Sequence, residues 1–98
     1  MEIEYDDDDL RRLEFDKAFT GGYSPAIVSG FRRLIQFIRA SSDERDFRAM
    51  RGFRFERLKG KREHEYSMRI NKQWRLVFEI RGQAPRKQIG VKGIEDYH

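Results

Sequence analysis

The chain has 98 residues, a length that accommodates one small domain with a modest hydrophobic core, so we predict a single domain over residues 1–98. Charged residues make up 39% and aromatic residues 13% of the sequence, and such an aromatic content is not typical of disordered chains. The sequence has no cysteine, which excludes a disulfide framework and a thiolate metal site.

The net charge of +4 is unevenly distributed along the chain. Residues 1–16 carry a net charge of −6, and residues 17–98 carry +10. A basic surface attracts polyanions, because lysine and arginine that neutralise phosphates release condensed counterions. The alternative is that these side chains only keep the protein soluble. The acidic start is unlike a signal peptide and no apolar run is long enough to span a membrane, so we expect a cytoplasmic protein without membrane contact.

The first predicted elements are a short strand and a helix. Ile3 and Tyr5 alternate with acidic residues, which is typical of an edge strand that charges protect. Asp6–Asp9 then precede Leu10 and Leu13. Acidic residues at the start of a helix complement its dipole, so this run predicts a helix entrance rather than a metal site.

A second helix is predicted from Ser24 and Pro25, an N-cap followed by proline at the first helical position, after Gly21 and Gly22 interrupt the first helix. Apolar residues recur in it at helical spacing and predict one face packed on a sheet, with three arginines pointing away. The apolar residues are Ile27, Phe31, Leu34, Ile35 and Ile38, and the arginines are Arg32, Arg33 and Arg39.

The segment between this helix and the sheet contains two local patterns. Ser41 and Glu44 have the spacing of a capping box, which predicts a short turn through Phe47. Phe53 and Phe55 alternate with charged residues, which predicts the first strand of an antiparallel sheet.

The next two strands form a hairpin through the sequence INKQW. A three-residue connection pairs Met68 with Leu76 and places Arg69 beside Arg75 on the sheet face away from the helices. A two-residue turn would pair different residues. A shift of one position in the pairing would move every side chain of the strand to the other face of the sheet. We predict the three-residue connection. Like charges directly opposite one another destabilise a sheet. The two arginines therefore indicate either a binding site for an anion or an ion pair with a glutamate.

The last predicted strand lies around Ile89 and Val91, and Gly93 after Lys92 indicates a bulge. This strand would bring the end of the chain to the arginines. We expect the face away from the helices to present Glu56, Lys59, Arg69, Arg75, Asp96, Tyr97 and His98.

The run LKGKREHEYSMRINKQWRLVFEI and the final DYH resemble the host-inhibition-of-growth (HigB) toxins of the RelE/ParE superfamily, from about Gly52 to His98 and more loosely through the helices. The resemblance implies an α+β, RelE/ParE-like fold in which a short N-terminal strand and two helices pack with an antiparallel sheet of about four strands. It also implies a type II toxin that cleaves messenger RNA on the ribosome as a metal-independent endoribonuclease, without a cofactor. The implied partners are the ribosome, messenger RNA and a HigA-like helix-turn-helix antitoxin, with operator DNA bound only through the antitoxin complex.

The resemblance implies roles for individual residues. Asp96, Tyr97 and His98 match the terminal catalytic triplet, and Arg69 matches the hairpin arginine that holds the phosphate. Glu56 stands where some relatives have a histidine, so the general base stays open between Glu56 and His98. The predicted RNA-binding and phosphate-binding residues are Arg57, Lys59, Lys61, Arg62, Lys72 and Arg75.

Cleavage of RNA without a metal ion needs only a few catalytic groups. Attack of a ribose 2′-hydroxyl on its own phosphorus requires a base, an acid for the departing 5′-oxygen, and cations. His98 is suited to either proton role, Glu56 or Asp96 to the other, and Tyr97 to stacking a base. Paired arginines suit the phosphate. His64 is predicted to lie exposed in a turn, and Lys59, Lys61 and Arg62 are equally typical of a solvated turn.

Two other functions stay open. A ParE-like poison shares the fold but binds DNA gyrase and cleaves no nucleic acid, and the terminal DYH argues against it. A decayed toxin would keep the fold and antitoxin binding but lack an effective base at Glu56.

Overall fold

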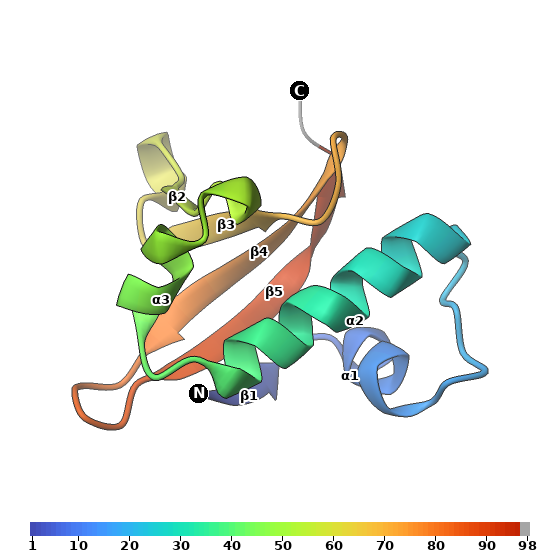
Figure 1. Ribbon diagram of the computed structural model, residues 1–98, viewed down its shortest axis with the longest axis horizontal. Helices are drawn as coiled ribbons and strands as arrows, with labels where there is room; N and C mark the ends of the chain where they lie inside the picture. Colours follow the sequence, from blue (N-terminus) through green and yellow to red (C-terminus); the bar gives the residue numbers. More distant parts are fainter. Residues whose placement is uncertain (97–98) are drawn as a thin grey trace.

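The computed structural model describes residues 1–96, and these form one mixed sheet with helices on it. The strands have the spatial order β1-β5-β4-β3-β2, and α2 crosses one face of the sheet with α1 beside it (Figure 1). The predicted fold class is confirmed. The elements are β1 (Glu2–Tyr5), α1 (Asp8–Phe15), α2 (Pro25–Ala40), α3 (Glu44–Ala49), η1 (Arg51–Phe53), β2 (Glu56–Arg57), η2 (Gly60–Arg62), β3 (Glu65–Arg69), β4 (Trp74–Arg81) and β5 (Gln88–Asp96).

The opening strand is an edge strand, as predicted, and it pairs in parallel with β5. Ile3 lies opposite Ile89, and the backbone N–H of Asp6 donates to the carbonyl oxygen of Val91 at 3.0 Å. The other neighbouring strands are antiparallel. The first and last segments of the chain therefore hold one another at the same edge of the sheet.

The first two helices begin where the sequence predicts. The Asp7 side chain caps α1 by accepting from the N–H of Asp9, and acidic residues fill its first turn. The Ser24 side chain caps α2, with Pro25 at its first turn. The predicted apolar residues of α2 are all buried: Ile27, Phe31, Leu34, Ile35 and Ile38. No helix among residues 1–96 is both long and apolar enough to cross a membrane.

The arginines of α2 lie off its buried face, and two of them bind α1. The Arg32 guanidinium donates to the carbonyl oxygens of Leu13 at 2.9 Å and Asp16 at 3.0 Å. Arg39 pairs with Glu14 on α1 at 2.6 Å. Carbonyl groups at the end of a helix lack partners within the helix. Arg32 therefore satisfies the C-terminal end of α1 and ties the two helices together.

The segment after α2 differs from its prediction in two ways. Asp43 and not Ser41 caps α3, because the Ser41 hydroxyl donates back to the carbonyl oxygen of Phe37 at 2.8 Å. The predicted strand at Phe53 and Phe55 is instead a 3-10 turn, η1, followed by Arg54 in the left-handed conformation with φ of 47°. The sheet resumes only with the two residues of β2.

The hairpin confirms the predicted register. Met68 lies opposite Leu76, and the N–H of Ile70 donates to the carbonyl oxygen of Trp74 at 2.8 Å. The predicted bulge is also present, because the register between β4 and β5 shifts at Lys92. Gly30 lets α2 approach this hairpin, since a Cβ atom there would lie 2.8 Å from Cγ2 of Ile70.

Candidate functional site

The hairpin brings two arginines together on the sheet face opposite the helices. Arg69 at the end of β3 lies directly opposite Arg75 at the start of β4. The side chain of Arg75 is only 15% exposed. Its Nη1 donates to the Ser67 hydroxyl at 3.0 Å, and its Nη2 lies 3.8 Å from a carboxylate oxygen of Glu56. The sequence prediction that Glu56, Arg69 and Arg75 gather on one face is therefore confirmed.

A small pocket of about 90 Å³ opens beside this pair. Four of the six residues that line it are cationic, and the other two are Trp74 and Asn71. The cationic residues are Arg54, Arg69, Lys72 and Arg75. Arginine and lysine groups converging on one small volume are suited to an anion, and guanidinium groups are suited to the paired oxygens of a phosphate.

Local hydrogen bonds fix the rim of the pocket. The Asn71 side chain accepts from the N–H groups of Gln73 at 2.9 Å and Trp74 at 2.8 Å, which is how an asparagine stabilises a turn. The backbone oxygen of Asn71 accepts from Nε of Arg69 at 3.1 Å. The turn therefore holds the Arg69 guanidinium at the pocket while Lys72 stays exposed at its tip.

Arg54 is a pocket residue that the sequence analysis missed. It occupies the left-handed region, which is uncommon for residues other than glycine and costs energy. Because Arg54 stands in a run of alternating aromatic and charged residues, the sequence predicted a strand there. No pattern of residue types signals a left-handed arginine. Its conformation turns the chain between η1 and β2 and leaves its side chain at the pocket.

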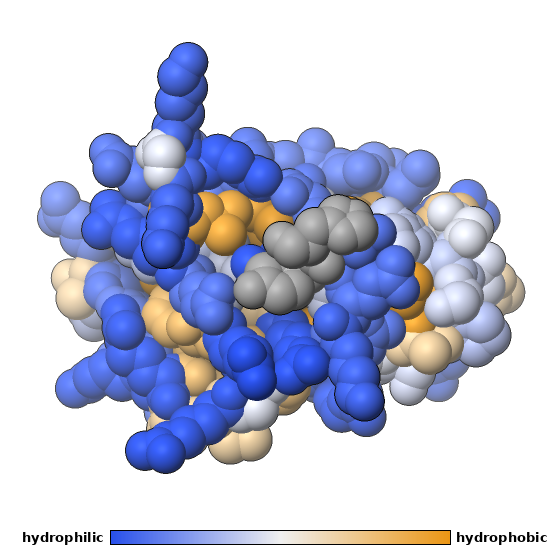
Figure 2. Space-filling model, turned by 90° about the horizontal axis from the view of Figure 1, so that it is seen from above, coloured by the Kyte–Doolittle hydropathy of each residue, from blue (hydrophilic) through white to orange (hydrophobic). Residues whose placement is uncertain are grey.

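A larger groove of about 490 Å³ adjoins the pocket and shares Arg69, Asn71 and Lys72 with it. Its other residues include Arg33 of α2 and the apolar side chains of Met50 and Phe53. Seen from above, this end of the molecule has projecting hydrophilic side chains around smaller hydrophobic areas (Figure 2). Such a mixture of cations and apolar surface fits an extended nucleic acid, whose phosphates and bases need different neighbours.

The end of β5 departs from the expected arrangement. The register places Glu95, not Asp96, opposite Arg75, whereas Asp96 lies opposite Trp74, whose side chain packs against the core. Successive residues of a strand face opposite sides, so the prediction that Asp96 shares the arginine face was wrong. Asp96 accepts a hydrogen bond from Nε2 of Gln73 at 3.2 Å. Tyr97 and His98 lie outside the described residues.

Arg62 is bound by carboxylates in this structure. Its guanidinium lies 2.7 Å from Glu65 and 2.5 Å from Glu95, so it links the turn of η2 to β5 across the sheet face. These contacts raise the pKa of Arg62, and the hydrogen bond from Arg62 lowers the pKa of Glu95. Glu95 was not among the predicted site residues, because its partner comes from a turn 33 residues earlier.

The other predicted RNA-binding residues follow the edge of the sheet that carries β2. Nε of Arg57 donates to the backbone oxygen of Glu63 at 2.5 Å. Lys59 and Lys61 are exposed before and within η2. His64 is exposed in the following turn, as predicted. The structure therefore places Lys59 and Lys61 on an exposed turn near the start of β3, at the other end of that strand from the hairpin pocket.

Similarity to solved structures supports the fold. The chain superimposes on a YoeB/ParE toxin from Agrobacterium tumefaciens with a TM-score of 0.61 and 18% identity, covering 100% of both chains. A YoeB-YefM complex from Staphylococcus aureus gives 0.59 and 18%, covering 100% of this chain and 97% of the other. The conserved hypothetical protein HP0894 from Helicobacter pylori gives 0.55 and 15%, covering 99% and 94%.

No sequence among the curated proteins matches this chain. The sequence does match a protein family over residues 3–89, a range that includes the helices, the hairpin arginines and the left-handed Arg54 and ends before the terminal triplet. That family is described as the RelE-like toxin of the type II toxin-antitoxin system HigB. The chain belongs to this family of HigB-like toxins.

Proposed function

We propose that this toxin is a ribosome-dependent endoribonuclease that cleaves messenger RNA without a metal ion and so stops translation. The observation that carries the proposal is the cross-strand pair Arg69 and Arg75, which forms a cationic pocket with Arg54 and Lys72. A phosphodiester bound there would have its developing negative charge stabilised by fixed guanidinium groups, which is the main requirement of metal-free RNA cleavage.

The proton transfers are assigned to groups around this pocket. Attack of the 2′-hydroxyl forms a new oxygen–phosphorus bond, and the bond to the 5′-oxygen breaks as that oxygen takes a proton. Glu56, within 3.8 Å of Arg75, is the carboxylate that would accept the first proton, and His98 would deliver the second or exchange roles with Glu56. Tyr97 would stack a base, and Asp96 would hold the terminal segment at the hairpin through Gln73.

The proposed partners follow from the basic surface and from the family. Lys59, Lys61, Arg57 and the exposed Lys72 would contact the RNA backbone of the message or the ribosome. A toxin of a type II system has a cognate antitoxin, and one structural relative is a YoeB-YefM complex. We propose a HigA-like helix-turn-helix antitoxin, through which alone the complex would bind operator DNA, and action in the cytoplasm.

The experiment that tests this function is the mapping of 5′ ends of messenger RNA in cells that express the toxin. The expected result is a set of new 5′ ends inside translated reading frames, lost when translation of the reporter is prevented by removing its start codon. A variant with Arg69→Ala should give few such ends at equal protein level. Intact transcripts accompanied by DNA damage would overturn the proposal and favour a gyrase poison. Intact transcripts without growth arrest would indicate a decayed toxin.

A further inference from the structure

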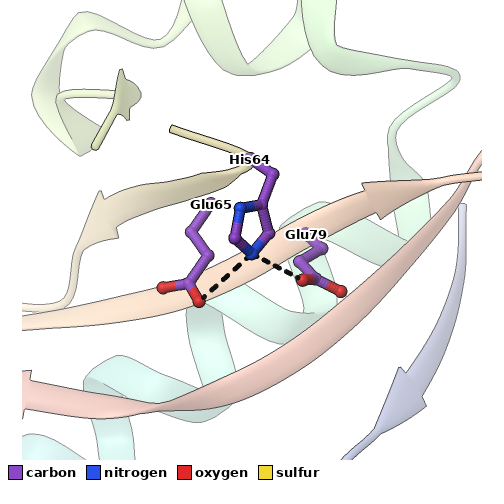
Figure 3. A group of neighbouring side chains, drawn as sticks. All are labelled: His64, Glu65 and Glu79. Carbon is purple, nitrogen blue, oxygen red and sulfur yellow. Dashed lines mark ion pairs between the residues drawn. The ribbon is translucent and has the colours of Figure 1, made fainter. Parts of the chain in front are cut away.

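A second group of chemically active side chains lies on the arginine face of the sheet but away from the pocket. His64, Glu65 and Glu79 converge where β3 begins, and their ligand atoms all lie within 4.8 Å of one another. Nε2 of His64 lies 3.4 Å from Oε2 of Glu79 and 3.8 Å from Oε2 of Glu65 (Figure 3). Three donor atoms from two neighbouring strands and the preceding turn therefore point at one small volume.

The strand register brings two like charges together in this cluster. Glu65 lies directly opposite Glu79 in the β3–β4 ladder. Like charges at such positions destabilise a sheet, and both side chains are mostly buried, with exposures of 13% and 21%. Arg62 and Arg81 offset part of this repulsion, and a cation between the two carboxylates would reduce it further.

Each carboxylate is already oriented by an arginine on its other oxygen. Oε1 of Glu65 lies 2.7 Å from Arg62, and Oε1 of Glu79 lies 2.8 Å from Arg81. The Oε2 atoms are the ones that face His64. Hydrogen-bonded support of ligand carboxylates is a regular feature of metal sites, because it fixes the direction of the ligating oxygen.

Two of the three spacings between the ligand atoms, those from His64, are close to the spacings around a tetrahedral ion. Zinc binds imidazole nitrogen and carboxylate oxygen at about 2.0–2.2 Å, which separates two tetrahedral ligand atoms by about 3.3–3.5 Å. The observed separation of 3.4 Å between His64 and Glu79 is within that range, and the 3.8 Å to Glu65 needs only a small side-chain movement. One nitrogen and two oxygen donors also suit zinc better than magnesium or calcium, which prefer all-oxygen sites.

We propose that His64, Glu65 and Glu79 form a binding site for a divalent transition-metal ion of the zinc type, with solvent as the fourth ligand. The bound ion ties the turn that follows η2 to β4. Glu65 and Glu79 each lie four residues from the arginine of their own strand, roughly 13 Å along the sheet, so the proposed ion would lie apart from the arginine pocket. The inference does not depend on the proposed function.

The test is calorimetric titration of Zn²⁺ into the purified full-length chain and into four variants. The unaltered protein should bind one ion per chain, and His64→Ala or Glu79→Gln should weaken binding at least tenfold. Because the His64 side chain is 63% exposed, its replacement should leave the protein folded, which a thermal melt without metal verifies.

Two control variants make the result decisive. Glu63→Gln changes the same charge in the same turn and should bind zinc as the unaltered protein does. His98→Ala removes the other histidine and should also retain binding. Zinc should raise the melting temperature of both controls but not that of His64→Ala. Absence of zinc binding, unchanged affinity of His64→Ala, or loss of binding in either control would overturn the proposal.

Discussion

Arg69 and Arg75 are direct cross-strand neighbours beside the turn of the β3–β4 hairpin. Two cations in this position repel one another, and the structure offsets the repulsion with the Ser67 hydroxyl, the Glu56 carboxylate and the backbone oxygen of Asn71. Glu95, which lies opposite Arg75 on β5, adds another carboxylate near the pair. If the pair binds a phosphodiester, as proposed, we expect its removal to affect cleavage more than folding.

The first prediction concerns Arg69. Replacing it by alanine removes one guanidinium from the pocket and also relieves repulsion of Arg75, so cleavage should fall at least about tenfold while thermal stability changes little. Toeprint or primer-extension rates on translating ribosomes, together with a thermal melt, measure both quantities. Arg11→Ala is the matched control, because Arg11 is exposed on α1 and pairs with Asp8 of the same helix. Equal losses of activity and stability would instead assign Arg69 a structural role.

The second prediction concerns the terminal histidine. A chain that ends at Tyr97 should be expressed in the absence of antitoxin without arresting growth, because the proposed proton carrier is gone. Its far-ultraviolet circular dichroism and melting temperature should match those of an inactive full-length variant such as Arg69→Ala. Growth arrest by the shortened chain would show that His98 has no part in the reaction.

The third prediction separates two roles of Arg62. Its ion pairs with Glu65 and Glu95 are partly exposed, so Arg62→Ala should lower the free energy of unfolding by about 1 kcal/mol or less. Glu95→Gln weakens the same contact and should give a similar or smaller loss. If Arg62 is purely structural, both variants retain cleavage in proportion to their folded fraction. A loss of ribosome binding in Arg62→Ala but not in Glu95→Gln would support direct contact with RNA.

The fourth prediction is a pH dependence at the edge of the sheet. Hydrogen bonds from Arg81 and Lys92 lower the pKa of Asp6 from 3.8 to about 2, with Arg81 the larger cause. Since the folded state favours the ionised carboxylate, the stabilisation is complete above about pH 4 and is lost as the pH falls towards 2. Asp6→Asn should thus be less stable than the unaltered chain at pH 7 and nearly equal to it near pH 2.

Urea unfolding at a series of pH values measures this difference. Asp9→Asn is the control, because Asp9 lies in the first turn of α1, where its charge interacts mainly with the helix dipole and should matter less. A difference between Asp6→Asn and the unaltered chain that stays constant from pH 7 to pH 2 would show that the ion pair with Arg81 contributes nothing.

Residue spacing predicted the structure correctly where the spacing of apolar residues or one helix cap is sufficient to determine it. The caps at Ser24 and in the acidic run before Leu10, the buried stripe of α2 and the hairpin register all follow from interactions within a few residues. The register was predictable because a slip by one residue would move the whole apolar set to the wrong face. The pairing of Arg69 with Arg75 is thus contained in the sequence.

The same kind of pattern misled around Phe53 and Phe55. Their alternation with charged residues imitates a strand, but the two rings pack against different aromatic partners, Phe37 at 4.9 Å and Tyr66 at 5.3 Å between centroids. The chain reaches both only by turning at Arg54 in the left-handed conformation. An alternation of apolar and charged residues shows which side chains are apolar, but it does not determine the backbone conformation of the segment.

The sequence by itself determined where α1 and α2 begin, the buried face of α2, the hairpin and the presence of a basic half, because each depends on composition or on neighbours a few positions away. Only the tertiary structure decided that β1 lies parallel to β5, that Arg54 joins the hairpin pocket, and that Glu95 and not Asp96 faces Arg75. These relationships join segments that are distant in the sequence, and packing of the whole core sets their geometry. A single bulge at Lys92, for example, shifts the residues of β5 that lie opposite β4 by one position.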